Sequence, residues 1–363
     1  MSKGISIHIG LNFIDLAHYG TTGTLKGCEN DANAMKKIAE ASGFKPTVIL
    51  NKDATSTRIL SELYRASQEL NKGDILLLTY AGHGSQVKDL MGEEVDGKDE
   101  TWCLYDRMLL DDELYNMWSK FKTGVKIVVV SDSCHSGTIT REIYLKNEIM
   151  YGPISTYRCL DPEIANHTFE KFNYLYGGIK FTVPREIKSE IGATVLLISG
   201  CQDNQLSGDG NDNGLFTSKL LEVWNGGLFT GTYKNFHQKI CEIMPVVQTP
   251  NYDVIGMIDV DFEKQKPFVL FESRSGIEEI DRDDKWRKLS WSLDVDEAYI
   301  NGLSEDELGT YLKGMVDTAL LPVYKKYRTI GSQIILPRGG EIHGECTAGD
   351  KGWGCSVGGS IRF

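Results

Sequence analysis

Short apolar runs alternate with amphipathic segments through the first 250 residues, and this alternation is the feature that most constrains the fold. The runs are residues 5–9, 47–50, 74–80, 125–130 and 193–199. Their length and their many β-branched residues are typical of strands that are buried on both faces. Helical periodicity is present between them, at residues 31–41 (with Asn30 as the expected N-cap), 55–70, 111–121 and 214–225. Strands and helices in alternation predict an α/β fold, with a mostly parallel sheet sandwiched by helices.

The chain has 363 residues, which is more than one small domain needs. We predict a first domain over residues 1–265 and a C-terminal α+β extension of unknown role over residues 266–363. Within the first domain, residues 138–190 combine mixed charges with weak periodicity. These residues are predicted to form an extended insertion or linker between a large and a small half of the domain.

Two local patterns indicate secondary structure in the extension. Residues 289–293 alternate between apolar and polar side chains, which suits a strand. Ser304 and Glu307 form a capping box that opens an amphipathic helix. A regulatory protein is a candidate partner of this extension.

The chain is acidic, with a formal net charge of −12 and a sequence pI of about 5.2. Such a chain repels nucleic acid and anionic lipid, so neither is an expected partner. Its eight cysteines are widely spread without a C-x-x-C pair, which favours a reducing compartment over a disulfide framework. No window approaches the length of a membrane span, and the first residues contain no apolar stretch before a cleavage site. We therefore expect a cytoplasmic chain with no membrane partner.

Two short polar segments follow neighbouring apolar runs, and each carries one candidate catalytic side chain. Residues 80–85 (YAGHGS) contain His83, and residues 131–137 (SDSCHSG) contain Cys134. Because the carboxyl ends of parallel strands meet at one edge of a sheet, both segments should project from that edge. An imidazole can deprotonate a thiol and later protonate a leaving amine. We predict that Cys134 is a nucleophile, that His83 is its partner, and that the N–H groups of Gly84 and Cys134 form an oxyanion hole.

These two segments resemble the catalytic segments of the caspase superfamily, and specifically those of metacaspases and of orthocaspases, their bacterial relatives. In caspases the histidine lies about 50 residues before a Gln-Ala-Cys signature. Here the separation is 51 residues, and Asp132-Ser133 stand in place of Gln-Ala. Further stretches that resemble the family are residues 25–32, residues 93–100 with 110–113, and residues 198–207 with 214–217. The resemblance covers residues 5–255 and implies a caspase-like cysteine endopeptidase that acts on proteins or peptides.

The resemblance also implies which residues line the substrate pocket. Metacaspases place carboxylates in the pocket for the residue before the scissile bond, at positions that match Asp31 and Asp132. Cys28 belongs to the same first loop as Asp31, and Asp203 is a weaker third candidate for the pocket. Two carboxylates in a partly desolvated pocket favour a cation, and arginine gains further from its forked guanidinium. Cleavage after Arg or Lys is therefore expected, whereas without the resemblance Asp31 would be interpreted as a first-turn residue that favours the helix dipole.

A cluster of acidic residues is a candidate calcium site. Many metacaspases need calcium, and the resemblance implies ligands at Asp111 and Asp112, to which a preceding acidic loop adds Asp96 and Asp99. Carboxylate oxygens are the ligands that Ca²⁺ prefers. Arg141 stands at another ligand position of the family and cannot bind a cation. The expected chemistry requires no cofactor, and both a calcium site and a solvated acidic loop stay open.

Self-cleavage between the two halves is a further property that the resemblance implies. Basic residues that offer a cleavage point within the predicted linker are Arg141, Lys146, Arg158, Lys171, Lys180, Arg185 and Lys188. The sequence does not distinguish between these bonds.

Three other interpretations of the sequence remain open. A catalytically silent caspase-like module would act as an interaction or regulatory domain, although both His83 and Cys134 are intact. A tyrosine phosphatase needs Cys-x5-Arg, whereas Arg141 lies seven residues after Cys134. A third interpretation is an irregularly spaced zinc site in the extension, built from His343, Cys346 and Cys355.

Overall fold

A computed structural model describes two units of this chain, divided after Ser273. The described residues are 2–88, 98–134, 156–182, 191–202, 205 and 207–270, together with the backbone of short strands after residue 287. Each unit is described by itself. The domain boundary predicted at residue 265 stays a prediction.

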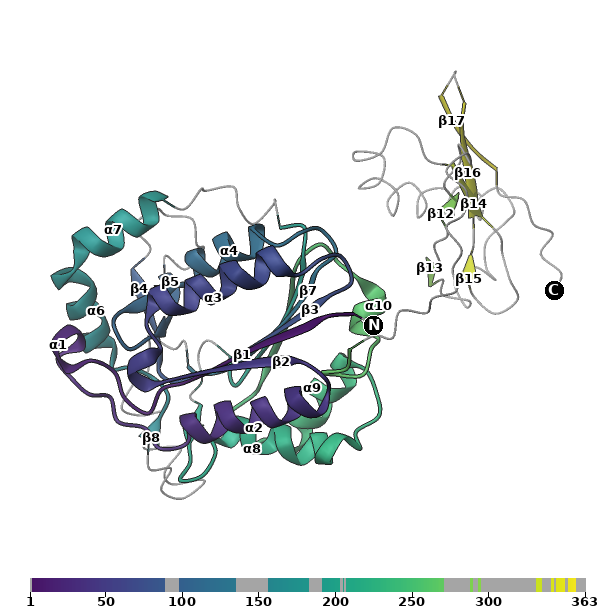
Figure 1. Cartoon of the computed structure of the whole chain (residues 1–363). Helices are drawn as coiled ribbons and strands as arrows, with labels where there is room; N and C mark the ends of the chain where they lie inside the picture. Colours follow the sequence, from purple (N-terminus) through teal and green to yellow (C-terminus); the bar gives the residue numbers. More distant parts are fainter. Residues whose placement is uncertain are drawn as a thin grey trace. The chain divides into compact units, whose positions relative to one another are not determined.

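The first unit is built on a six-stranded sheet in the order β11-β9-β7-β3-β1-β2 (Figure 1). The strands are β1 Gly4–Gly10, β2 Lys45–Leu50, β3 Ile75–Ala81, β7 Lys126–Asp132, β9 Thr194–Ser199 and β11 Asn251–Gly256. Neighbouring strands run parallel except for β11, which is antiparallel to β9. The predicted α/β class with a mostly parallel sheet is confirmed.

Helices cover both faces of this sheet (Figure 1). They are α1 Leu16–Tyr19, α2 Cys28–Ala41, α3 Ser56–Glu69, α4 Asp111–Ser119, α6 Pro162–Lys171, α7 Asn173–Thr182, α8 Leu215–Trp224, α9 Tyr233–Ile243 and α10 Val260–Glu263. Two 3₁₀ turns, Asn51–Asp53 and Asn225–Gly227, complete the helical segments. One core joins α3, α4 and α6 to one face of the sheet, and a second core joins α2, α8 and α9 to the other. Successive side chains of β3 point to opposite faces of the sheet, so alternate residues of this strand belong to the first and to the second core.

The first unit also contains two smaller sheets. One is formed by β4 Gly84–Lys88, β5 Lys98–Cys103 and β6 Met108–Leu110. The other is the antiparallel pair of β8 Thr156–Tyr157 and β10 Gly208–Asp209. Both begin at or near the carboxyl edge of the central sheet, where the candidate catalytic segments lie.

Two local expectations about helices are wrong. Helix α2 begins at Cys28, so Asn30 lies inside it and cannot be its N-cap. The side chain of Asn12 accepts hydrogen bonds from the N–H groups of Cys28 and Glu29 at 3.0 and 3.3 Å, and so replaces a local cap. The predicted extended linker is also wrong for residues 162–182, which form α6 and α7 because their apolar side chains pack into the first core.

The second unit contains short strands. They are β12 Lys288–Leu289, β13 Leu293–Asp294, β14 Gly331–Ile334, β15 Glu341–Ile342, β16 Gly344–Gly349 and β17 Gly352–Ser356. Of the strand expected at 289–293, Leu289 lies in β12 and Leu293 in β13, and residues 290–292 lie outside the described residues. The helix expected from Ser304 also lies outside the described residues. Cys346 and Cys355 are register partners in β16 and β17, and a zinc site there stays untested.

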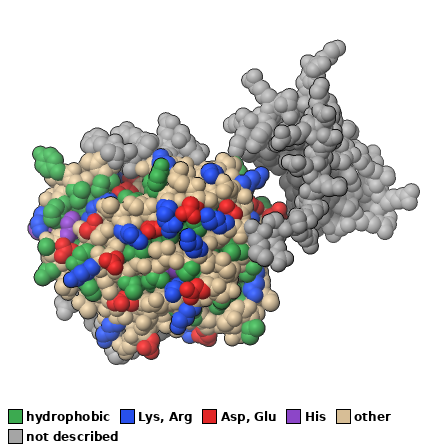
Figure 2. All heavy atoms as spheres, in the orientation of Figure 1, with side chains coloured by type: hydrophobic (Ala, Val, Ile, Leu, Met, Phe, Trp, Pro, Cys, Tyr) green, Lys and Arg blue, Asp and Glu red, His purple; other side chains and the backbone are tan. Residues whose placement is uncertain are grey.

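The surface of the first unit carries charges of both signs. Figure 2 shows acidic and basic side chains interspersed on one face, with hydrophobic side chains between them. Among the described residues, no helix is long and apolar enough to cross a membrane.

The pH dependence of folding should follow from His8 in β1. This side chain is fully buried and hydrogen-bonded to Thr79 Oγ1 at 3.0 Å and to Ser6 Oγ at 2.9 Å. Burial, and secondarily Lys36, lowers the pKa of His8 from 6.5 to about 3. The unfolded chain therefore binds the proton first, and the stability present above pH 6.5 is lost progressively as pH falls towards 3.

Urea unfolding at pH 7 and at pH 4.5 tests this expectation. The variant His8→Gln should lose less stability between the two values than the native chain, whereas His167→Gln, at an exposed position of α6, should lose as much. An equal loss in His8→Gln and in the native chain would refute the assignment.

Candidate active site

The ends of strands β3 and β7 bring the two predicted segments together. Ala81 and Asp132 are register partners in neighbouring parallel strands, and His83 and Cys134 each lie two residues further along. The backbones touch there, because a Cβ added to Gly84 would lie 2.0 Å from the carbonyl oxygen of Cys134. The strand-end argument therefore places both side chains at one edge of the sheet.

The His83 imidazole is oriented by a backbone carbonyl. Its Nε2 lies 2.8 Å from the carbonyl oxygen of Gly23, which can only accept, so Nε2 carries the proton and Nδ1 is the basic nitrogen. Burial lowers the pKa of His83 to about 4, and the Gly23 carbonyl partly offsets this effect. A Cβ at Gly23 would lie 3.0 Å from the ring, and the φ angle of Gly23 is +48°. Sequence reasoning did not identify Gly23 as the group that orients the imidazole.

The Cys134 thiol is buried beside a loop from the second half of the unit. Its Sγ accepts a hydrogen bond from the N–H of Ser207 at 2.7 Å. Burial raises the pKa of Cys134, and Cys201 beside it adds to the effect. The thiol and the imidazole are thus both held in their neutral forms.

The two predicted oxyanion donors point at one carbonyl group. The N–H groups of Gly84 and Cys134 each donate a hydrogen bond to the carbonyl oxygen of Arg158, both at 3.0 Å. Two N–H groups at this distance from one oxygen match the geometry expected of an oxyanion hole. The carbonyl of the Arg158–Cys159 peptide bond therefore lies where the carbonyl of a scissile bond would lie.

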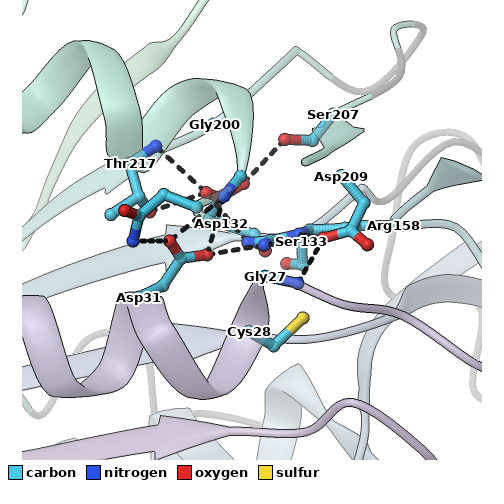
Figure 3. A network of polar contacts seen from close by, with 12 residues as sticks. Gly27, Cys28, Asp31, Asp132, Ser133, Arg158, Gly200, Ser207, Asp209 and Thr217 are labelled. Carbon is cyan, nitrogen blue, oxygen red and sulfur yellow. Dashed lines mark hydrogen bonds and ion pairs between the residues drawn. The ribbon is translucent and has the colours of Figure 1, made fainter. Parts of the chain in front are cut away.

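The side chain of Arg158 fills an acidic pocket (Figure 3). Its guanidinium is fully buried and pairs with Asp31 at 2.5 Å, with Asp132 at 2.9 Å and with Asp209 at 3.0 Å. The three carboxylates come from α2, from the end of β7 and from β10. Asp31 and Asp132, the two carboxylates that the resemblance implied, thus both pair with this guanidinium, and their role toward a substrate stays a prediction. Asp209 pairs with it as well and was not identified from the sequence.

Backbone and hydroxyl donors hold the carboxylates of this pocket. Asp132 accepts from Ser207 Oγ at 2.7 Å and from the hydroxyl of Thr217 at 2.7 Å. Asp31 accepts from the N–H of Gly214 at 3.1 Å, at the N-terminus of α8. These donors orient the carboxylates by contacts other than those with Arg158, and such supporting hydrogen bonds favour selection for charge and shape.

Burial and the cation act in opposite directions on the pocket. Burial raises the pKa of Asp31 to about 6, although Arg158 lowers it. Burial also disfavours the charge on Arg158, yet Asp132 and the other carboxylates keep the pKa of Arg158 well above its usual value. The nearby guanidinium thus favours the ionised form of Asp31, which burial disfavours.

The chain on either side of Arg158 is bound as an added strand. Before it, β8 pairs with β10, and the N–H of Arg158 donates to the carbonyl oxygen of Ser207 at 2.9 Å. After it, the N–H of Leu160 donates to the carbonyl oxygen of Gly84 at 2.9 Å. Strand addition of this kind is a common way in which an extended peptide is held.

Two other predicted pocket residues have different positions. Cys28 is fully buried at the start of α2, where burial raises its pKa, and Figure 3 draws it beside the pocket without a polar contact to Arg158. Asp203 lies outside the described residues. Cys28 and Asp203 therefore stay predictions as substrate-binding residues.

Three of the predicted metal ligands form an acidic cluster, and the ammonium group of Lys180 lies among them. Oxygens of Asp99, Asp111 and Asp112 lie within 4.8 Å of one another, and Asp96 lies outside the described residues. The ammonium group of Lys180, in α7, forms a close ion pair with Asp99 and lies 3.7 Å from Asp112. The oxygen donors suit a hard cation, but Lys180 already places positive charge among them.

Comparison with known proteins defines the family. A model of the caspase domain matches residues 11–271. The chain is 28% identical over 252 residues to Metacaspase-1 of Schizosaccharomyces pombe, covering 60% of this chain and 58% of that protein. It is 30% identical over 221 residues to Metacaspase-1 of Arabidopsis thaliana, covering 57% of this chain and 53% of that protein. The chain thus spans little more than half the length of these curated relatives.

A solved structure is also similar to this chain. The crystal structure of a protein from Geobacter sulfurreducens is similar with a TM-score of 0.68 and 44% identity, over 74% of this chain and 100% of that one. The chain belongs to the caspase domain family, whose relatives here are the metacaspases. The predicted family is therefore confirmed.

Gly214 should determine whether the pocket can accept arginine. A Cβ at Gly214 would lie 2.5 Å from Cζ and Nη2 of Arg158, too close for the guanidinium to stay in place. The φ angle of Gly214 is −60°, so alanine can adopt its backbone conformation. The variant Gly214→Ala should therefore fold but should lose roughly 5- to 160-fold in kcat/KM on an arginyl peptide, since a clash of this kind typically costs about 1–3 kcal/mol.

Circular dichroism and peptide hydrolysis of the same preparation measure both properties. Gly178→Ala, at an exposed position of α7 where an added Cβ meets open space, controls for a general effect of the substitution on stability. Native turnover in Gly214→Ala would show that the guanidinium does not enter beside Gly214.

Proposed function

We propose that this chain is a cysteine endopeptidase that cleaves after Arg, and less efficiently after Lys, with Cys134 as nucleophile and His83 as its proton acceptor and donor. One observation carries the proposal: the carbonyl of Arg158 lies on the N–H groups of Gly84 and Cys134 while its guanidinium fills the acidic pocket. The main chain and the side chain of Arg158 thus both occupy the positions that a substrate residue before the scissile bond would need.

The reaction follows from the positions of these groups. Nδ1 of His83 takes the proton of the Cys134 thiol as the sulfur attacks the carbonyl carbon before the scissile bond. The N–H groups of Gly84 and Cys134 stabilise the negative charge that develops on the oxygen. His83 then protonates the leaving amine, a thioester remains on Cys134, and water hydrolyses it.

The charge of the pocket supports the preference for arginine. Asp31, Asp132 and Asp209 would repel an aspartate side chain, which would also be desolvated there without a partner. A guanidinium meets all three carboxylates at once through Nε and both terminal nitrogens. The compact ammonium of lysine has three donors at one point and cannot reproduce this fork.

Peptides that differ only in the residue before the scissile bond test this preference. We expect kcat/KM to fall in the order Arg, Lys, Gln, Asp, and we expect no turnover by Cys134→Ala. Asp209→Asn should lower kcat/KM on the arginyl peptide by roughly 30-fold or more, as the loss of one partner from a buried charge pair implies.

The matched control is Asp212→Asn, which removes an exposed carboxylate from the same loop. It should retain native activity on the arginyl peptide. Cleavage of the aspartyl peptide as fast as the arginyl peptide would remove the proposed specificity.

The same geometry supports self-cleavage at one bond. Of the basic side chains that the structure describes between residues 156 and 182, Arg158 is the one whose carbonyl meets the oxyanion donors. Lys171 lies in α6, and Lys180 pairs with the acidic cluster. The Arg158–Cys159 bond is therefore the proposed site of self-processing.

Substitution of basic residues in this segment tests the assignment. The variant Arg158→Gln should stay intact under conditions in which the native chain is cut, because glutamine leaves the pocket without its cation. Lys171→Gln should be cut at the native rate, as followed by denaturing gel electrophoresis. Native processing of Arg158→Gln would exclude this bond.

Calcium takes no part in the proposed reaction. Lys180 supplies positive charge to the cluster of Asp99 and Asp112, and none of the steps above requires a metal. Calcium dependence remains a prediction of the resemblance.

A further inference from the structure

We propose that the cut at Arg158–Cys159 is reversible: the new amine of Cys159 stays in the active site and reseals the thioester on Cys134. The chain would then act as a peptide ligase on its own cleaved bond as well as a protease. This inference rests on the proposed function and concerns what happens after the first step of self-cleavage.

The segment after the cut stays attached close to the bond. The N–H of Leu160 donates to the carbonyl oxygen of Gly84, and Cys159 forms a parallel bridge with Gly84. The backbone of Cys159 also lies close enough to the His83 imidazole to raise its pKa slightly against the effect of burial. The hydrogen bond of Leu160 and the contact with His83 do not require the Arg158–Cys159 bond to be intact, whereas the bridge to Gly84 also uses the carbonyl of Arg158.

Helices α6 and α7 anchor the same segment in the first core. Leu160, Phe169 and Tyr176 are buried there. The hydroxyl of Tyr176 lies 2.9 Å from Nε2 of His18 and accepts a hydrogen bond from the N–H of Met108 at 3.2 Å. At the far end, Lys180 pairs with the acidic cluster. The leaving group is thus a folded part of the domain and not a free peptide.

The segment before the cut is held independently. The guanidinium of Arg158 keeps its ion pairs with the pocket, and its N–H keeps the hydrogen bond to Ser207. Strands β8 and β10 add the pairing of Thr156 with Asp209. Both new ends therefore remain at the positions that they occupied in the intact chain.

The two directions of the reaction balance without another reactant. In the forward step, Cys134 Sγ bonds to the carbonyl carbon of Arg158, the C–N bond to Cys159 breaks, and the thiol proton passes through His83 to the amine. In the reverse step, the amine attacks the thioester, the C–S bond breaks, and the proton returns through His83 to the sulfur. Hydrolysis competes by placing water on the same carbonyl carbon and gives the carboxylate of Arg158 and the free thiol of Cys134. This step also runs in reverse: Cys134 Sγ attacks the Arg158 carboxyl group, water leaves, and the thioester that the Cys159 amine reseals is formed again.

The held amine competes strongly with water. Well-oriented intramolecular reactants have effective molarities of about 10⁵–10⁸ M, far above the concentration of water. The neutral imidazole of His83, whose pKa burial lowers to about 4, can accept the proton of the attacking amine. Most thioesters should therefore return to intact chain, and water should complete the cut only when the Cys159 end moves away.

Intact mass measurement of the full chain, approached from both directions, tests reversibility. One sample starts as freshly made intact chain, and the other as chain that has self-processed and been purified without denaturation. We expect intact chain to reappear in the second sample until both reach the same ratio of intact to cleaved chain. Alkylation of Cys134 in the processed sample should stop the reappearance.

Lys180→Met measures the role of the anchored segment. It should lower the plateau ratio of intact to cleaved chain by roughly tenfold or more, as the breaking of a buried ion pair implies. Lys239→Met, which removes an exposed ion pair on α9, should leave the ratio unchanged.

The outcomes separate this inference from the proposed function. Processing that runs to completion, with no return of intact chain from the processed sample, would overturn resealing and leave the protease intact. Absence of any cut in the native chain, together with absence of peptide hydrolysis, would overturn both.

Discussion

The buried guanidinium of Arg158 among three carboxylates is the interaction on which the rest of the site depends. Asp31, Asp132 and Asp209 come from separate parts of the sequence, and one cation joins them. Loss of one partner from such a cluster leaves an uncompensated buried charge, at a cost of about 3–5 kcal/mol. The cluster therefore fixes the path of residues 156–160 and, with it, the position of one carbonyl group.

Under the proposed function, the same contacts account for both substrate recognition and latency. A pocket that holds Arg158 with its carbonyl on the oxyanion donors must be vacated before another protein can enter it. External substrates thus compete with a segment that is tethered and already ordered, and the tether favours the internal segment through its effective concentration. Occupancy of the pocket by Arg158 keeps the Cys134 thiol from external substrates. The Arg158–Cys159 bond is both the bond that blocks the site and the first bond in position for cleavage.

Much of this arrangement could be predicted from the sequence. The apolar runs indicated five of the six strands of the central sheet, and the glycine-flanked segments indicated that His83 and Cys134 lie at neighbouring strand ends. Asp31 and Asp132 followed from the resemblance to metacaspases and not from composition or spacing. Strand β11 was missed because its residues are half-exposed at the sheet edge and lack a continuous apolar run.

The remaining features depend on tertiary contacts that leave no local pattern. Gly23 acts through its backbone carbonyl, which every residue type carries. Asp209 lies in a glycine-rich stretch with other acidic residues, where nothing distinguishes it until β10 pairs with β8. Helices α6 and α7 are short and become stable by burial of Phe169 and Tyr176, so their periodicity alone was too weak to predict them.

The central claim is that the intact chain presents the Arg158–Cys159 bond to its own nucleophile. N-terminal sequencing of the fragment released by self-processing tests it most directly, with Cys134→Ala as the uncut reference. The account predicts one new N-terminus, which begins Cys159-Leu160-Asp161. A new N-terminus at any other residue, or the same cut in Cys134→Ala, would contradict it.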